Sequence, residues 1–355
     1  MRRVVSAMVC GLIASVFPLA AADPVPGPLH SLNVYFPYLF FVQSSGAYAQ
    51  SQPAGTLAAT ITESYGNTFL IGTSQTNGFD NPFLLIDGEA AYTEFALSWT
   101  PITGTTVGLR ALHVVHCGGF LDPIVHTFHE LFGFRTGARE ERPEGEVVFF
   151  VRPEPTDTFR WSGPIAGLQS LTADAVHTLI PHADGPLPAL SSEISVKLPL
   201  VWSGFRASGV DAMARLLARW YLGAADRVAI DASVGAAYLT RPQVVPEQWF
   251  DPWVLPAGLS VAWRALPRLT PTVSISGTTS PYSVDTELLD RFSAHAVIGA
   301  SFELREHLQL QAGFAEEFLT FATADISFHA SLQYRVSRQS NPRPRLRRRA
   351  PKTVK

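Results

Sequence analysis

Apolar and polar residues alternate along segments of about ten residues through much of this chain. In 325–336 every second residue is apolar, and Ser327 and His329 are among the residues between them. The segments 227–239 and 292–304 repeat this pattern. A period of two is typical of β-strands that have one apolar face and one polar face. The chain is therefore predicted to be all-β.

Weaker alternation extends this prediction to most of the chain. The segments concerned are 89–99, 105–115, 190–202, 258–266 and 307–316. The segment 212–221 is ambiguous, because its residue types also suit a helix. We predict a strand there, because Arg215 and Arg219 share one face in a period of two.

The two faces suit the wall of a transmembrane barrel, with a polar lumen and an apolar outer surface. Ten residues that rise about 3.3 Å each and tilt by about 40° cover roughly 25 Å, the apolar height of an outer membrane. Aromatic residues near the segment ends suit interface girdles: Trp99, Trp202, Trp220, Tyr238, Trp249, Phe250, Trp253 and Tyr334. A secreted β-sandwich is the alternative, although so many ten-residue strands would make an unusually large one. After residue 22, no apolar run approaches 18 residues, which excludes a helical membrane bundle.

The links between the predicted strands alternate in length, as they do in outer-membrane barrels. Short links fall at 100–104, 223–226, 267–268 and 305–306, and longer ones at 67–85, 116–145, 240–256 and 278–291. Dividing 146–180 into the three strands 146–152, 158–165 and 172–180 makes about 14 strands. Twelve strands are the alternative. We predict a transmembrane antiparallel β-barrel with a short helix in one long loop.

Both ends of the chain differ from the barrel region. Arg2 and Arg3 precede an apolar run, and Ala20-Ala21-Ala22 supplies a cleavage site, so 1–22 is predicted to be a signal peptide. The barrel then spans 23–336. The segment 337–355 carries eight basic residues, three prolines and no acidic residue, which predicts a disordered tail.

These end segments predict a location and a set of partners. Export through a cleaved signal peptide places the barrel in the outer membrane of a Gram-negative bacterium. We expect it to contact outer-membrane lipid and the barrel-assembly machinery, and its basic tail to contact anionic lipid or cell wall. Export argues against nucleic acid as a partner. Cleavage leaves Cys117 alone, which excludes an internal disulfide and a Cys-rich zinc cluster.

Several motifs resemble a known family. They are GPLHSLNVYFP near the start, LLIDGEAAY at 84–92, CGGFLDPIVHTFHELFGFRTGAREERP at 117–143, LSSEISVKLPL at 190–200 and Ser208-Gly209-Val210-Asp211. With them the chain resembles proteobacterial outer-membrane proteins that share a domain of unknown function. The resemblance implies a membrane-spanning β-barrel and no particular reaction. The chain departs from the usual barrel terminus, because a basic tail follows Tyr334-Arg335-Val336 where an aromatic residue normally ends the chain.

One long loop holds the residue types that could carry chemistry. The segment 120–132 is predicted to be an amphipathic helix with Asp122, His126, His129 and Glu130 on its polar side. A carboxylate and two imidazoles on one face can bind zinc, so Asp122, His126 and His129 are the candidate ligands if the protein binds a metal. The alternative is a loop helix that packs into the barrel mouth with its polar face in water. No cofactor is expected.

The next stretch of the same loop is densely charged. Arg135, Arg139 and Arg142 would influence ion preference if they lined a pore mouth. As a solvated loop they would do nothing specific.

Three functions follow as hypotheses from these patterns. The first is a pore or a binding and transport barrel for a small solute. The second is a hydrolase of envelope lipid that uses the His and Asp residues of the loop helix. The third is a structural envelope barrel without catalysis. The sequence contains neither the Gly-x-Ser-x-Gly elbow nor the His-x-Ser-Asn motif of outer-membrane phospholipases, so an enzyme is the less favoured class.

Overall fold

The structure is a computed structural model of the chain. It describes residues 25–35, 38, 41–44, 46–72, 84–133, 143–154, 157–182, 187–200, 209–222, 226–243, 245–283, 292–316 and 326–337. The predicted signal peptide and all of the predicted tail after Ser337 lie outside the described residues. In the described ranges, no helix is both long and apolar enough to cross a membrane.

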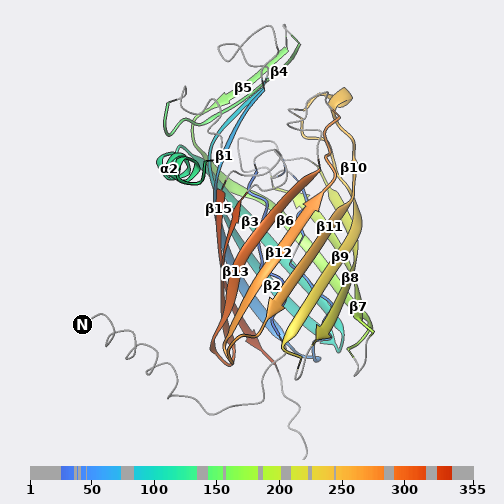
Figure 1. The fold of residues 1–355 in the computed structure, drawn as a ribbon. Coiled ribbons are helices and arrows are strands. Elements are labelled where there is room, and N and C mark those ends of the chain that lie inside the picture. Colours follow the sequence, from blue (N-terminus) through green and yellow to red (C-terminus); the bar gives the residue numbers. More distant parts are fainter. Residues whose placement is uncertain are drawn as a thin grey trace, which may run out of the picture.

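The described antiparallel strands belong to one continuous sheet, most of which forms the wall of a barrel (Figure 1). They are β1 (Leu57–Gly72), β2 (Leu84–Ile102), β3 (Thr105–Cys117), β4 (Val148–Glu154), β5 (Asp157–Ser162), β6 (Ile165–Ile180), β7 (Ala189–Pro199), β8 (Asp211–Leu222), β9 (Val228–Tyr238), β10 (Trp253–Val254), β11 (Pro256–Trp263), β12 (Leu269–Thr278), β13 (Ser293–Arg305), β14 (Leu308–Glu316) and β15 (Ile326–Val336). The helix α2 (Asp122–Phe132) and the short 3-10 helix η3 (Glu247–Trp249) lie in the long connections.

The wall closes through its first strand. β1 pairs with β2 along its whole length, and its residues 57–67 pair with β15. The circuit then runs through β14, β13, β12, β11, β9, β8, β7, β6 and β3 back to β2. Twelve strands therefore form a closed antiparallel barrel, as the alternative count from the sequence predicted.

The count of about 14 strands was too high by two for the barrel wall, and the reason lies in 146–180. β4 and β5 do form, but as a hairpin on the extension of β2, where Leu84–Asp87 pairs with Val148–Val151. Figure 1 shows this hairpin projecting beyond the rim. β6 is one continuous strand of 16 residues where parts of two strands were predicted. Strand composition alone does not distinguish a wall strand from a projecting hairpin.

The alternation of residue types separates the two faces as predicted. On β9, Val234 is 58% exposed on the outer face, while Ala229 and Asp231 are buried on the inner face. The ambiguous segment 212–221 lies in β8, with Arg215 and Arg219 both facing inward and buried. Large apolar side chains therefore cover the outside of the barrel, and hydroxyl, amide and charged groups line the inside.

The two ends of the barrel differ. At one end, which we call the short-turn end, neighbouring strands are joined by links as short as Thr103-Gly104 between β2 and β3. Gly104 has φ +83°, a conformation that tight hairpin turns require and that glycine adopts without strain. The longer connections, including the one that contains α2, emerge at the opposite, long-loop end (Figure 1).

A charge on the outer face tests whether lipid covers it. Val234→Arg, in the middle of β9, should lower the free energy of unfolding in lipid vesicles by about 2–4 kcal/mol. Val336→Arg, at the short-turn end of β15, should lower it by about 0–1 kcal/mol, because a charge near the interface stays hydrated. Denaturant titration in vesicles measures both. Equal destabilisation by the two variants would contradict a lipid-facing wall.

Candidate functional site

The described residues between Val25 and Gln52 lie inside the barrel. We call the described residues of 25–52 the lumen segment. Its side chains Val25, Leu32, Val34, Tyr35 and Ala49 are almost completely buried. Since it touches strands on every side of the wall, the segment fills the space that an open pore would leave empty.

At the short-turn end, Arg219 of β8 holds the start of the lumen segment. Its Nη2 donates hydrogen bonds to the carbonyl oxygens of Val25, at 2.6 Å, and Pro26, at 2.8 Å. The guanidinium also lies 4.4 Å from the ring centroid of Tyr48, further along the segment. Asp231 on β9 is the counter-charge, 3.7 Å from Arg219 Nε. Arg219 therefore contacts two parts of the segment and the wall together.

Deeper in the lumen, a carboxylate holds both the segment and the wall. His30 Nε2 lies 2.8 Å from Glu94 Oε1, and Arg110 donates to the other oxygen of Glu94 at 3.1 Å. Arg110 also donates to both oxygens of Asp174 and to the carbonyl oxygen of Gln43. This network links β2, β3 and β6 to two separate parts of the segment.

At the long-loop end, Asp211 is the third attachment point. It is fully buried and accepts hydrogen bonds from the backbone N–H of Val42 at 2.9 Å and of Thr240 at 2.8 Å. Lys197 Nζ, also buried, donates to the same carboxylate at 2.8 Å. Because a buried charge is stable only with a partner, this pair fixes where the segment turns back.

The segment then returns to the short-turn end. Ala49 packs with Ala189 and Leu217, and the Gln52 carbonyl oxygen accepts a hydrogen bond from the Gly104 N–H at 3.0 Å. Both ends of the lumen segment therefore lie at the short-turn end of the barrel.

The inner wall has two chemically different halves. From β2 to β9, the buried inward side chains include four cations and five carboxylates: Arg110, Lys197, Arg215 and Arg219, with Glu94, Asp174, Glu193, Asp211 and Asp231. From β11 to β15, the buried polar side chains that the structure describes are hydroxyls and one imidazole: Ser260, Thr270, Thr272, Ser274, Ser293, Ser301, Ser327, His329 and Ser331. The lumen is therefore polar all round, and among the described residues its buried charged side chains lie on one side.

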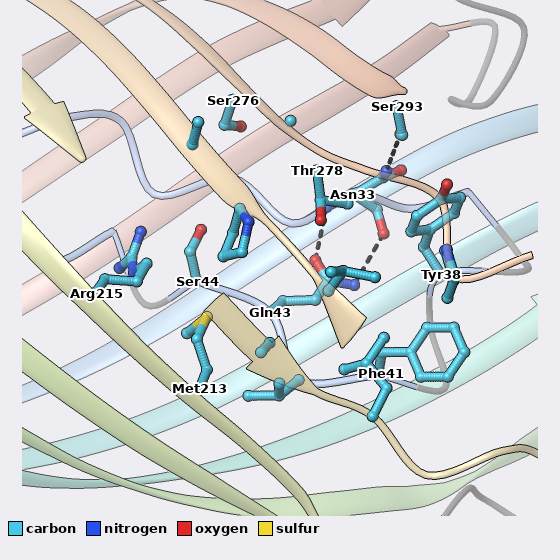
Figure 2. Close-up of a pocket in the computed structure, with 18 of the residues that line it drawn as sticks. Asn33, Tyr38, Phe41, Gln43, Ser44, Met213, Arg215, Ser276, Thr278 and Ser293 are labelled. Atoms are coloured by element: carbon cyan, nitrogen blue, oxygen red, sulfur yellow. Dashed lines mark hydrogen bonds between the residues drawn. The ribbon is translucent and has the colours of Figure 1, made fainter. Parts of the chain in front are cut away.

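Two cavities flank the lumen segment. A cavity of about 440 Å³ at the short-turn end lies between Tyr48 and the β13–β14 turn at Glu306. A smaller cavity of about 100 Å³ lies toward the long-loop end, between the segment and strands β8 to β13 (Figure 2). We call this smaller space the upper cavity. The figure shows Asn33, Gln43 and Met213 around it.

The predicted loop helix forms, but on the outside of the barrel. Leu121 and Val125 pack against Ile326, Tyr65 and Phe314, which belong to the outward faces of β15, β1 and β14. Figure 1 shows α2 beside the wall. The alternative in which this helix packs into the barrel mouth is therefore wrong: a different segment fills the lumen.

Buried carboxylates hold α2 against the wall. Glu89 of β2 accepts hydrogen bonds from the Tyr65 hydroxyl and the Leu121 N–H. Gly119, with φ +65°, passes so close to Glu89 that any side chain there would collide with the carboxylate. Asp122 accepts hydrogen bonds from Asn67 Nδ2 at 2.9 Å and from the Gly145 N–H at 2.8 Å.

The candidate metal ligands do not converge. The Asp122 carboxylate faces Asn67 and Gly145, whereas His126 Nε2 lies 3.3 Å from Glu130 Oε1. Within the described ranges, no three His, Cys, Asp or Glu side chains come close enough to hold a metal ion. Arg135, Arg139 and Arg142 lie outside the described residues, so their predicted position at a pore mouth stays a prediction.

Removing the Arg219 side chain should loosen the lumen segment. Arg219→Ala loses both carbonyl contacts, so amide hydrogen exchange at His30, Asn33 and Val42 should accelerate. It also leaves Asp231 buried without its counter-charge, which should destabilise the barrel by about 3–5 kcal/mol. Hydrogen exchange followed by mass spectrometry, with a denaturant titration beside it, measures both effects.

A double variant separates the two effects. Arg219→Ala with Asp231→Ala removes the isolated charge, so stability should recover while the faster exchange remains. Unchanged exchange in the lumen segment of both variants would show that Arg219 does not hold it.

Comparison with solved structures finds the same fold in an outer membrane channel from Pseudomonas putida F1, with a TM-score of 0.50 and 11% sequence identity over 81% of this chain and 97% of that one. The P. putida toluene transporter TodX matches with a TM-score of 0.37 and 9% identity over 80% of this chain and 90% of that one. The KdgM porin matches with a TM-score of 0.39 and 6% identity over 78% and 98% of the two chains. We base the fold assignment on the first match alone.

A sequence comparison shows the family. No protein with a curated description matches this chain. A family model described as "Protein of unknown function (DUF3187)" matches residues 5–336, which include every described strand. The chain therefore belongs to the DUF3187 family and has the fold of an outer-membrane channel.

Proposed function

We propose that this protein is an outer-membrane channel for small solutes, in which the lumen segment occupies the path and has to shift for a solute to pass. The observation that carries the proposal is the closed twelve-strand wall, with apolar side chains outside and polar side chains inside. In outer-membrane barrels a polar interior of this kind is a water-filled channel or is plugged by part of the chain.

The attachment of the lumen segment is compatible with movement. Its described residues form no strand, and it is held by a limited set of hydrogen bonds, ion pairs and apolar contacts. Displacing it breaks these contacts but no strand pairing, so the wall can stay closed. The cavities on its two sides supply space at both ends of the path.

The family and the fold support the proposed location. The P. putida F1 protein of the same fold is described as an outer membrane channel. For this chain we propose the same membrane, reached through cleavage of 1–22. We also propose contact with membrane lipid and the assembly machinery, and contact of the basic tail with anionic lipid or cell wall.

The geometry favours a channel over a hydrolase. Asp122 holds the start of α2 in place on the outer wall, and His126 pairs with Glu130 rather than with Asp122. A catalytic arrangement needs these groups to meet at one reacting atom. The inner wall, in contrast, places polar groups from strands all round the barrel about a single lumen.

Conductance measurements test the proposal. In planar bilayers, the wild-type protein should show small or rare openings, because the lumen segment blocks the path. Asp211→Ala removes the bond to the Val42 N–H and should raise the open fraction or the conductance several-fold. Ser260→Ala is the matched control, because Ser260 faces the lumen and its hydroxyl, among the described residues, bonds only to Ser274 of the wall, at 2.9 Å.

The same variants in a liposome-swelling assay report the passage of uncharged solutes. If the wild type and Asp211→Ala both show neither conductance nor solute flux while remaining folded, the protein is not a channel.

A further inference from the structure

We infer that the upper cavity is a binding site for a small, uncharged, amphiphilic molecule that carries a hydroxyl or similar hydrogen-bonding group. The inference rests on the proposed channel function, because it names the solute class that this path would accept. Three properties of the cavity lead to it: an aromatic and aliphatic side, a polar side with a spare hydroxyl, and the absence of an uncompensated charge among its described lining residues.

The apolar side of the cavity comes from both the lumen segment and the wall. Tyr38 and Phe41 belong to the segment, and Met213 and Val254 to the barrel. Two other rings hold Phe41 in place: its ring centroid lies 5.9 Å from that of Phe250 and 6.2 Å from that of Tyr282. An apolar part of a ligand would therefore meet a surface that is already ordered.

The polar side is also ordered before any ligand binds. The Asn33 N–H donates to Gln43 Oε1 at 2.8 Å, and Gln43 Nε2 donates back to the Asn33 carbonyl oxygen at 3.0 Å. Asn33 Nδ2 donates to Ser293 Oγ at 3.1 Å, which joins the segment to β13 (Figure 2). Most polar groups on this side of the cavity are therefore already bonded to other groups of the protein.

Thr278 differs from these groups. Thr278 lines the cavity, and its buried Oγ1 has no hydrogen-bond partner among the described residues. A buried hydroxyl without a partner is destabilising. A hydroxyl or amide group on a ligand would supply the missing hydrogen bond.

The charge in the cavity lining is already paired, which argues against an ionic ligand. Arg215 is the one Lys, Arg, Asp or Glu side chain among the described lining residues, and Glu193 compensates it. Arg215 Nε donates to Glu193 Oε2 at 2.8 Å, and its Nη2 contacts the same oxygen. An ion that entered would lose its hydration without gaining a free counter-charge.

The size of the upper cavity limits the ligand to a small molecule. Its volume is about 100 Å³. An apolar cavity of about 150 Å³ holds one benzene molecule. The upper cavity is somewhat smaller than that, so a molecule of about one ring is the upper limit, and it would need a small shift of the lumen segment to fit.

Titration with phenol tests the inference on the full-length protein in detergent. Phenol is uncharged at neutral pH and joins an aromatic ring to one hydroxyl. We expect saturable binding by calorimetry, with contacts visible in saturation-transfer NMR. Benzoate, a ring of the same size with a negative charge, should bind at least tenfold more weakly.

Two pairs of variants locate the binding site. Thr278→Val removes the spare hydroxyl without changing the shape and should weaken phenol binding about fivefold. Its control is Thr272→Val, on the same strand and face but away from the cavity. Met213→Trp fills the cavity and should reduce binding at least tenfold, whereas Leu216→Trp places the same ring on the outer face of β8. Migration on unheated gels shows whether each variant is folded.

The outcomes separate this inference from the channel proposal. Equal phenol binding by wild type, Thr278→Val and Met213→Trp, or benzoate binding as tight as phenol, would overturn the inference. Conductance without saturable phenol binding would overturn it while the channel proposal holds. Phenol binding that these variants weaken, in a protein without conductance or flux, would support the site and remove the channel.

Discussion

The structure depends on the closure of the wall through β1. Inside a lipid bilayer, a backbone N–H or carbonyl group that lacks a partner is destabilising by several kcal/mol, because no water is present to replace the hydrogen bond. β1 pairs with β2 on one side and β15 on the other, so every wall strand has two neighbours. This closure also sets the inner space, because twelve strands enclose a lumen that the side chains of the wall alone do not fill. The lumen segment occupies what remains.

The sequence predicted the wall well, since each of its strands carries its own signal. A period of two depends on neighbours within one strand, so the outward positions of Val234 and Ile298 and the inward positions of Asp231 and Ser301 could be assigned without knowing the pairing. The number of strands in the barrel was harder to predict. β4 and β5 have strand-like sequences, but whether a hairpin joins the wall or extends a neighbour depends on its register with β2.

The contents of the lumen could not be predicted in the same way. The lumen segment has neither a helical nor a strand period, because its side chains contact different parts of the wall in turn: Arg219 on β8, Glu94 on β2 and Ser293 on β13. Its partners on the wall lie far away in the sequence: His30 bonds to Glu94, 64 residues away, and to Gln311, 281 residues away. The helix in the long loop was predicted correctly as a helix. Whether the helix lies inside or outside the barrel depends on the Glu89 contacts, which its own amphipathic pattern does not reveal.

The return path of the lumen segment has a topological consequence. The segment is a loop whose two ends are on the same side of the barrel, near Arg219 and Gly104. To leave through the far opening, it would have to pull the beginning of β1 out of the seam with β15. Withdrawal is therefore one-sided: the loop can retract toward its own anchorage while the seam remains intact, and a molecule that displaces it pushes it in that direction or bends it aside.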